Sequence, residues 1–285
     1  MRIIVTGANG KVGSQLVAIL SKQHDVLGYD LEDLDIVNFE QVRTIVYQQQ
    51  PDLVINAAAW TDVDGCARDP ERAVAINGYG AQNLAIATHE IGSAILQISS
   101  NEVFDGHSTR SYHEYDAMNP VNPYGYSKMV GERSVIQASP RHYIVRISWL
   151  FAHGGHNFIH AILNAVHAGK QLRVVVDEVA NPTYNDDCVE AIAQLIETKR
   201  YGTYHFCNAG YCSRHEFARY FLDHAGYSDI PIFKISRHQW SRPSTPPVYT
   251  SLANTFGKQL GITLRPWQDA VDMFLEKEDL LTIAE

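Results

Sequence analysis

Short apolar runs rich in β-branched residues recur through the first half of the chain, and between them apolar residues return every three to four positions. Such runs predict buried strands, and a spacing near 3.6 residues predicts helices with one apolar face. Strands that alternate with helices predict an α/β fold with a doubly wound, Rossmann-like parallel sheet. The predicted strands cover residues 3–5, 26–29, 53–55, 95–98 and 143–147.

Local signals predict where two of the helices begin or end. Residues 72–90 have the pattern of one long helix, and Gly92 follows as a stop signal. Asn122 is a suitable N-cap for the next helix, and Pro123 is suited to its first position because proline has no amide hydrogen to leave unpaired.

The alternation loosens after Trp149. The pattern predicts helices over residues 157–167 and 186–198, strands over 172–176 and 203–206, and further helical stretches after a proline-rich loop at 242–247. We expect a dinucleotide-binding domain over residues 1–149. Residues 150–285 are expected to form a smaller α/β substrate-binding part, with segments around 172–206 returning to the first domain. A cleft between the two parts would then hold the ligands.

Charge and composition exclude several classes of protein. The chain carries 23 basic and 32 acidic residues, a net charge of −9, which gives nucleic-acid binding no electrostatic support. No apolar run reaches the roughly 18 residues needed to cross a membrane, and the chain enters a strand at once without a signal-peptide pattern. The four cysteines lack CxxC spacing and the 13 histidines form no tight cluster, so no metal site is predicted. We expect a cytoplasmic protein with no nucleic-acid or membrane partner.

A glycine motif follows the first strand directly: Gly7-Ala8-Asn9-Gly10-Lys11-Val12-Gly13. In a dinucleotide-binding loop, Gly7 would permit the tight turn, Gly10 would let the backbone approach a pyrophosphate, and Gly13 would let the helix pack closely. The helix N-terminus would offer free amide hydrogens and a positive dipole end to the phosphates. The alternative is a glycine-rich turn with no ligand.

Two further features fit a dinucleotide. Asp30 lies 20 positions beyond Gly10 at the end of the second strand, where a carboxylate can accept hydrogen bonds from the adenosine ribose and repel a 2′-phosphate. On charge alone this favours NAD(H), although Asp30 can also simply begin a loop. Ala57, Ala58 and Ala59 follow the third strand, and their small side chains leave room for a ring or a ribose or, alternatively, form a close-packed turn.

Candidate catalytic residues follow in the middle of the chain. Tyr124 and Lys128 are four positions apart on a predicted helix and share a face. We expect the lysine ammonium to lower the pKa of the Tyr124 phenol, which would help it act as an acid or base. Ser100 ends the fourth strand, where its hydroxyl could polarise a substrate carbonyl. Tyr126 is a rival phenol but would point elsewhere, and the bland alternative is an exposed helical Tyr–Lys pair.

With these motifs the chain resembles the extended short-chain dehydrogenase/reductase family and, within it, the dTDP-4-dehydrorhamnose reductases. Besides the glycine loop and the Tyr-x-x-x-Lys pair, the resemblance covers nearly the whole chain in order and spacing. It rests on Leu34-Asp35-Ile36, the segment from Val54 to Asp64, Val103-Phe104-Asp105-Gly106, Arg146-Ile147-Ser148-Trp149-Leu150, Asn157-Phe158 and Asn181-Pro182-Thr183.

The resemblance implies reduction of the C4 keto group of dTDP-4-dehydro-6-deoxy-L-mannose to dTDP-L-rhamnose, with Tyr124 as proton donor and Lys128 and Ser100 assisting. It implies NADPH or NADH as cofactor, and a homodimer as a family expectation. The implied cofactor-binding residues are Gly7, Asn9, Gly10, Lys11, Val12, Gly13, Asp30, Asp35, Ile36, Ala57, Ala58, Ala59, Tyr124 and Lys128. The implied substrate-binding residues are Val63, Ser100, Glu102, Trp149, Asn157 and Arg242. Trp149 has the alternative of a core aromatic, and Arg242 that of a surface-loop charge.

The chain departs from the family pattern beside the predicted catalytic serine. Where the family usually has Ser-Thr-Asp-Tyr, this chain has Ser99-Ser100-Asn101-Glu102. Serine for threonine keeps the hydroxyl, whereas Glu102 places a carboxyl group where an aromatic ring would line the sugar site. Two other readings therefore stay open: a reductase or epimerase of another nucleotide sugar, and a non-catalytic dinucleotide-binding regulatory subunit, as found for methionine adenosyltransferase.

Overall fold

A six-stranded parallel sheet forms the centre of the computed structural model, which describes residues 1–155 and 157–281. The strand order is β10-β5-β4-β3-β1-β2, the order of a doubly wound nucleotide-binding sheet. The predicted fold class is therefore confirmed. The strands are β1 (Arg2–Thr6), β2 (Asp25–Tyr29), β3 (Leu53–Asn56), β4 (Ala94–Ser100), β5 (His142–Ile147) and β10 (Gly202–His205).

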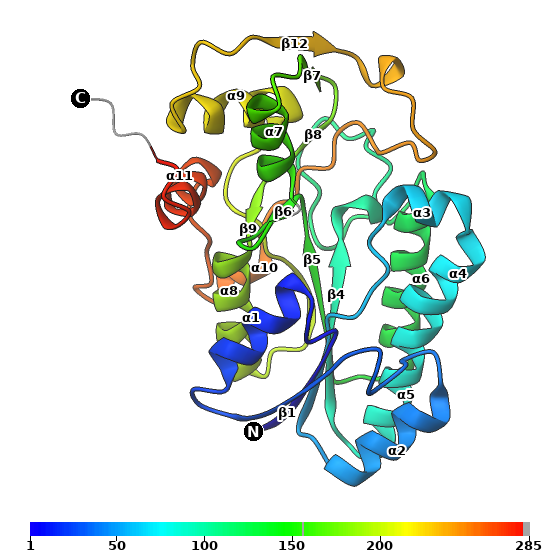
Figure 1. The fold of residues 1–285 in the computed structure, drawn as a ribbon. Coiled ribbons are helices and arrows are strands. Elements are labelled where there is room, and N and C mark those ends of the chain that lie inside the picture. The colour runs from blue at the N-terminus through cyan, green and yellow to red at the C-terminus, as the bar shows by residue number, and fades with distance from the viewer. Residues whose placement is uncertain (156, 282–285) are drawn as a thin grey trace.

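Helices cover both faces of the sheet because successive strand residues point to opposite sides. Ile3 and Val5 face one apolar core, and Ile4 faces another. Figure 1 shows α1 and α8 on one face and α2, α5 and α6 on the other. These helices are α1 (Lys11–Leu20), α2 (Phe39–Gln49), α5 (Ala81–Glu90), α6 (Pro123–Ala138) and α8 (Asn185–Thr198).

The predicted helix over residues 72–90 is only partly right. It consists of α4 (Pro70–Val74), a π-helical segment η1 (Ala75–Gly80) and α5. In η1, the Asn77 side chain bonds the Trp60 backbone and Ser127, and glycines at 78 and 80 allow close packing. A π-segment re-aims side chains within a helix, and here it joins the β3 loop to α6.

Residues from 150 onward contribute to both regions of the molecule. Helix α8 packs on α1, and β10 pairs with β5 at the edge of the central sheet. A third apolar core lies beyond the carboxyl ends of the strands, among α7, α9, α11 and the short sheets (Figure 1). The elements are β6 (Leu150–Phe151), α7 (Phe158–His167), β7 (Leu172–Val175), β8 (Val179–Ala180), β9 (Thr183–Tyr184), β11 (Cys212–Ser213), α9 (Arg214–His224), β12 (Ile232–Ile235), η3 (Arg237–Gln239), α10 (Phe256–Gln259) and α11 (Trp267–Lys277).

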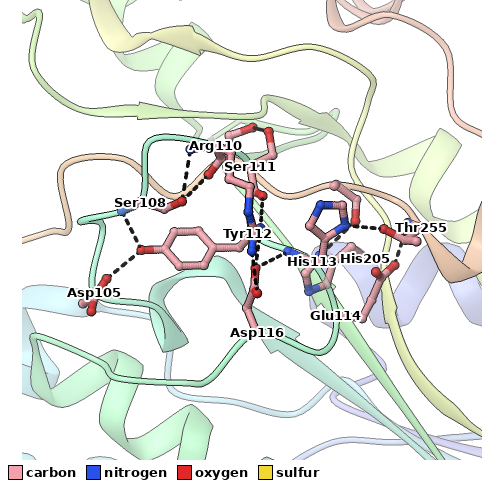
Figure 2. Close-up of polar contacts among 12 residues, drawn as sticks. Asp105, Ser108, Arg110, Ser111, Tyr112, His113, Glu114, Asp116, His205 and Thr255 are labelled. Atoms are coloured by element: carbon pink, nitrogen blue, oxygen red, sulfur yellow. Dashed lines mark hydrogen bonds and ion pairs between the residues drawn. The ribbon is translucent and has the colours of Figure 1, made fainter.

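Hydrogen bonds and a backbone bridge attach the loop after β4 to the segment around residues 252–255 (Figure 2). The Tyr112 hydroxyl donates to Asp105 at 2.6 Å, and Tyr112 pairs with Leu252 in a parallel bridge. The Glu114 carboxylate accepts the backbone N–H of Thr255 at 2.9 Å. These contacts fix the segment that leads from β4 to α6, the two elements that carry the predicted catalytic residues. The remaining elements of this region are α3 (Val63–Arg68) and η2 (Asn101–Val103).

Within residues 1–155 and 157–281, none of the helices combines the length and apolar character that a bilayer crossing requires.

Candidate active site

The glycine loop between β1 and α1 has the geometry that the motif predicts. Gly7 has a φ of +68°, and a Cβ there would lie 2.7 Å from the Ala58 nitrogen. A Cβ at Gly13 would collide with the Gly7 carbonyl oxygen, so the close approach of α1 is to the loop rather than to the sheet. Gly10 caps α1 with extended backbone and without a side chain over the helix N-terminus. The first residues of α1, from Lys11 to Gly13, border a cavity.

Hydrogen bonds of two side chains, Asp30 after β2 and Lys11 at the start of α1, hold the glycine loop in place. The Asp30 carboxylate accepts the N–H of Asn9 and the N–H of Leu31, each at 2.8 Å. Lys11 lines the cavity and donates to the carbonyl oxygens of His153 and Gly154 at 3.1 and 2.7 Å. Asp30 is thus a loop-anchoring residue here, and its predicted contact with a ribose stays a prediction.

The other predicted cofactor residues lie along the same sheet edge. Asp35 and Ile36 follow β2, where Ile36 is buried against Gly80 and the Asp35 carboxylate accepts the N–H of Val37. Ala57 and Ala59 border a cavity, whereas Ala58 packs against Gly7. Of the two alternatives drawn from the sequence, Ala57 and Ala59 fit the one that leaves room for a ligand, and Ala58 fits the close-packed turn.

Tyr124 and Lys128 come from the first turns of α6. The Asn122 side chain caps this helix by accepting the Gly125 N–H at 2.8 Å, and Pro123 occupies its first position, as predicted. A Cβ at Gly125 would collide with the Glu102 carbonyl oxygen, so η2 and the start of α6 pack backbone to backbone. This packing brings Ser100, at the end of β4, beside Tyr124.

The predicted effect of Lys128 on Tyr124 is wrong. The Lys128 ammonium donates to the Ile98 carbonyl at 2.7 Å, and burial lowers the pKa of Lys128 to about 8. Burial raises the pKa of the Tyr124 phenol above its ordinary value, the Glu102 carboxylate raises it further, and a hydrogen bond with Ser100 acts in the opposite direction. Tyr124 is thus held in its protonated form, which is the form of a proton donor.

Four charged side chains face the cleft beyond Tyr124, and we name them the cleft cluster: Glu102, Glu178, Arg214 and Arg242. The Arg214 guanidinium lies 3.6 Å from the centre of the Trp149 ring and 3.8 Å from the Glu178 carboxylate. Trp149 has a φ of +37°, a strained value for a bulky residue, which sets its ring against Arg214 at the cleft wall. Burial raises the pKa of both carboxyl groups, those of Glu102 and Glu178.

Arg242 spans the cleft from the proline-rich loop. Its guanidinium donates to Asp64 of α3 at 2.9 Å, and the same carboxylate accepts the N–H of Ser244. Asn157 caps α7 through His160 and donates to the Ala152 carbonyl, so its polar atoms hold the loop at the cleft edge. The Arg242 side chain thus joins the two walls, and its predicted contact with the substrate stays a prediction.

Most of the predicted site residues line two adjoining cavities. The first, about 440 Å³, is lined by Gly10, Lys11, Val12, Gly13, Ala57, Ala59, Val63, Ser100, Glu102, Tyr124, Lys128, Trp149 and Asn157. The second, about 700 Å³, continues past Trp149 and Arg214 to Phe158, Trp240 and Arg242. Gly7, Asn9, Asp30, Asp35, Ile36 and Ala58 lie outside both linings. A further hollow of about 740 Å³ lies at the opposite end of the strands, away from all of these residues.

Sequence reasoning missed Arg214 and Glu178. Arg214 opens α9, whose N-terminus has a capping box between Ser213 and Glu216. That Ser-x-x-Glu signal was visible in the sequence and could have located the helix start, although not its place in the cleft. Nothing local marked Glu178, which precedes the short strand β8.

A second charged group lies behind the site, and we name it the inner cluster: Ser99, Glu132, Arg146 and His205. Arg146 bonds Glu132 through Nε and Nη2 at 2.7 to 3.2 Å, and Ser99 donates to the same carboxylate at 2.5 Å. Arg146 also contacts Nε2 of His205 at 3.2 Å. In the part of the chain that the structure describes, no three His, Cys, Asp or Glu side chains are grouped as metal ligands.

Similarity to known proteins shows to which family this chain belongs. The family model described as RmlD substrate binding domain matches residues 1–280. The chain belongs to this RmlD family. It is 35% identical to a dTDP-4-dehydrorhamnose reductase of Mycolicibacterium smegmatis, over 95% of this chain and 84% of that protein. It is 33% identical to the spore coat polysaccharide biosynthesis protein SpsK of Bacillus subtilis, over 97% of each.

A solved structure of a similar protein has the same fold over nearly the whole chain. It is the dTDP-4-dehydrorhamnose reductase of Bacillus anthracis in complex with NADP, with a TM-score of 0.93, 33% identity, and coverage of 97% of this chain and 99% of that one. The resemblance drawn from the sequence motifs is therefore confirmed.

Proposed function

We propose that this RmlD family chain reduces the C4 keto group of dTDP-4-dehydro-6-deoxy-L-mannose to the hydroxyl of dTDP-L-rhamnose with NADPH or NADH. The observation that carries the proposal is one cavity bordered by the glycine loop, Ser100, Tyr124 and Lys128. The names of relatives at 33–35% identity support the same activity.

The residues at the glycine loop fit a dinucleotide. Side chains at Gly7 and Gly13 would fill or distort the turn, and the N-terminus of α1 presents amide hydrogens next to the cavity. A reduced nicotinamide bound there supplies the hydride that the carbonyl carbon receives. The Lys128 ammonium, next to this position, is available to ribose hydroxyl groups.

Tyr124 supplies the proton. Its phenol is protonated at neutral pH, because burial and the Glu102 carboxylate both raise its pKa. The Ser100 hydroxyl adjoins Tyr124 and can donate to the same ketone oxygen, which stabilises negative charge as it develops there. The proton of Tyr124 then passes to that oxygen to give the hydroxyl group.

The second cavity suits the nucleoside diphosphate. Arg214 and Arg242 supply guanidinium groups that can bind phosphate oxygens in pairs, and Phe158 and Trp240 offer apolar surface to a base. The sugar would then lie between Trp149 and Tyr124, where the two cavities meet. Cytoplasmic location and a homodimer remain part of the proposal, to be checked by cell fractionation and light scattering.

The test is an NAD(P)H oxidation assay with dTDP- and UDP-4-keto-6-deoxyhexoses, with the product identified by NMR. We expect turnover of dTDP-4-dehydrorhamnose, and a loss of roughly 10²- to 10⁴-fold in Tyr124→Phe, since that is the usual contribution of a positioned acid. Tyr126→Phe is the matched control, because Tyr126 is 51% exposed and two positions away.

Full activity of Tyr124→Phe would defeat the role of Tyr124. Absence of turnover on every sugar, together with co-purification of a larger enzyme, would instead favour the reading as a binding subunit.

A further inference from the structure

Glu102 is held in one orientation on the wall of the first cavity. Its Oε2 atom accepts a hydrogen bond from Asn122 Nδ2 at 2.6 Å, and Asn122 also caps the helix that carries Tyr124. The backbone N–H of Glu102 donates to the Ser100 hydroxyl at 3.2 Å. Glu102 is therefore tied to both catalytic elements, β4 and α6.

The second carboxylate oxygen of Glu102 has no partner. Among residues 1–155 and 157–281, no hydrogen bond reaches Oε1 and no cation lies within 4 Å of the carboxylate. The two arginines of the cleft cluster already have carboxylate partners, Glu178 and Asp64. Glu102 is only partly buried and lines the cavity of Tyr124 and Ser100, so this oxygen can accept a hydrogen bond from a donor group of a bound ligand.

The position of Glu102 restricts what that ligand group is. Tyr124 faces the ketone oxygen in the proposed function, and Glu102 lines the same cavity, with its backbone packed against Gly125, the residue after Tyr124. The sugar carbons nearest to Glu102 are then the two neighbours of the ketone carbon. In a 4-keto-6-deoxyhexose one neighbour, C5, bears a methyl group, and the other, C3, bears a hydroxyl that can donate.

We propose that Glu102 is a specificity-determining residue whose Oε1 atom accepts a hydrogen bond from the sugar hydroxyl next to the ketone. The inference rests on the proposed function, since it takes the orientation of the sugar from Tyr124. It assigns to this chain a preference for sugars that keep the C3 hydroxyl, made by a carboxylate rather than by an aromatic wall.

The experiment compares dTDP-4-keto-6-deoxyhexose with its 3-deoxy counterpart in the wild type, Glu102→Gln and Glu102→Leu. We expect kcat/KM of the wild type to favour the 3-hydroxy sugar by roughly 10- to 100-fold, the range for a hydrogen bond to a charged acceptor. Glu102→Gln keeps a neutral acceptor and part of this preference, whereas Glu102→Leu loses it. Glu178→Gln, which changes the other cleft carboxyl group, should keep it.

Calorimetric binding of dTDP-L-rhamnose and its 3-deoxy analogue gives a second readout that needs no turnover. If neither ketone is reduced but the wild type binds the 3-hydroxy nucleotide more tightly and Glu102→Leu does not, the proposed function fails while the role of Glu102 stands. Equal preference in the wild type and Glu102→Leu, in turnover and binding alike, would overturn the inference. Melting temperatures and NADPH fluorescence show whether each variant is folded.

Discussion

The inner cluster and the cleft cluster begin three positions apart, at Ser99 and Glu102, yet they are built in opposite ways. In the inner cluster, Arg146 and Glu132 are 4% and 0% exposed and share several short hydrogen bonds. In the cleft cluster, the Arg214–Glu178 separation is 3.8 Å, and one oxygen of Glu102 has no partner among the described residues. The comparison teaches that charges which satisfy one another hold the fold together, whereas charges left incomplete are available to a ligand.

The largest expected contrast is in stability. Arg146→Met would leave Glu132 buried without its partner, so we expect the free energy of unfolding to fall by about 3–5 kcal/mol. Arg214→Met should cost about 1 kcal/mol or less, since its ion pair is long and partly exposed. Urea unfolding of both variants measures the difference. Similar losses in the two would show that the clusters do not differ in structural role.

The next effect is a dependence of stability on acid. Burial holds the pKa of His205 well below its ordinary value, and Arg146 and the Ala253 carbonyl fit its neutral form. The unfolded state binds a proton below about pH 6.5 while the folded state does not, so stability falls as pH decreases through that value. We expect a loss approaching about 1.4 kcal/mol per pH unit from this residue. Unfolding measured between pH 5 and 7 should show a smaller slope in His205→Gln.

The smallest effect concerns Lys128, on which the inner cluster acts through Glu132. The pKa of Lys128 is about 8, lowered by burial and partly restored by Glu132 one turn along α6. Activity should therefore decline above about pH 8 as the ammonium is lost. Glu132→Gln should move this decline to lower pH, because it removes the charge that raises the pKa of Lys128. Lys128→Arg stays charged, so its activity should decline less above about pH 8. If the decline of activity at high pH is unchanged in both variants, Lys128 does not cause it.

The sequence made the first half of the site predictable because its parts are local. The glycine loop, the Asn122 cap and the Tyr124–Lys128 spacing each depend on residues within one turn or one helix. The six sheet strands followed from apolar runs for the same reason, since a buried strand needs only a short stretch of apolar residues.

In the cleft cluster, Glu102 and Arg242 followed only from the family resemblance, and Arg214 and Glu178 could not be predicted. Arg242 meets Asp64 across 178 positions, and Arg214 reaches Trp149 from a different element. No periodicity links such residues, because their contact is made by the packing of separate elements. The same limit explains the wrong pKa expectation for Tyr124. The spacing placed Lys128 on the correct face of the helix, but burial and Glu102 determine the pKa of the Tyr124 phenol.

The chain crosses from the central sheet to the outer core and back, with β10 closing the sheet edge and α8 covering α1. A protein engineer who wishes to exchange ligand preference among relatives therefore cannot join two genes at a single point after β5. Such a hybrid would take β10 and α8 from one parent and the strand and helix that they pack on, β5 and α1, from the other. Side chains at these two contacts would then not fit one another. Exchange of separate loops, such as the one that carries Arg242, leaves the inherited scaffold intact.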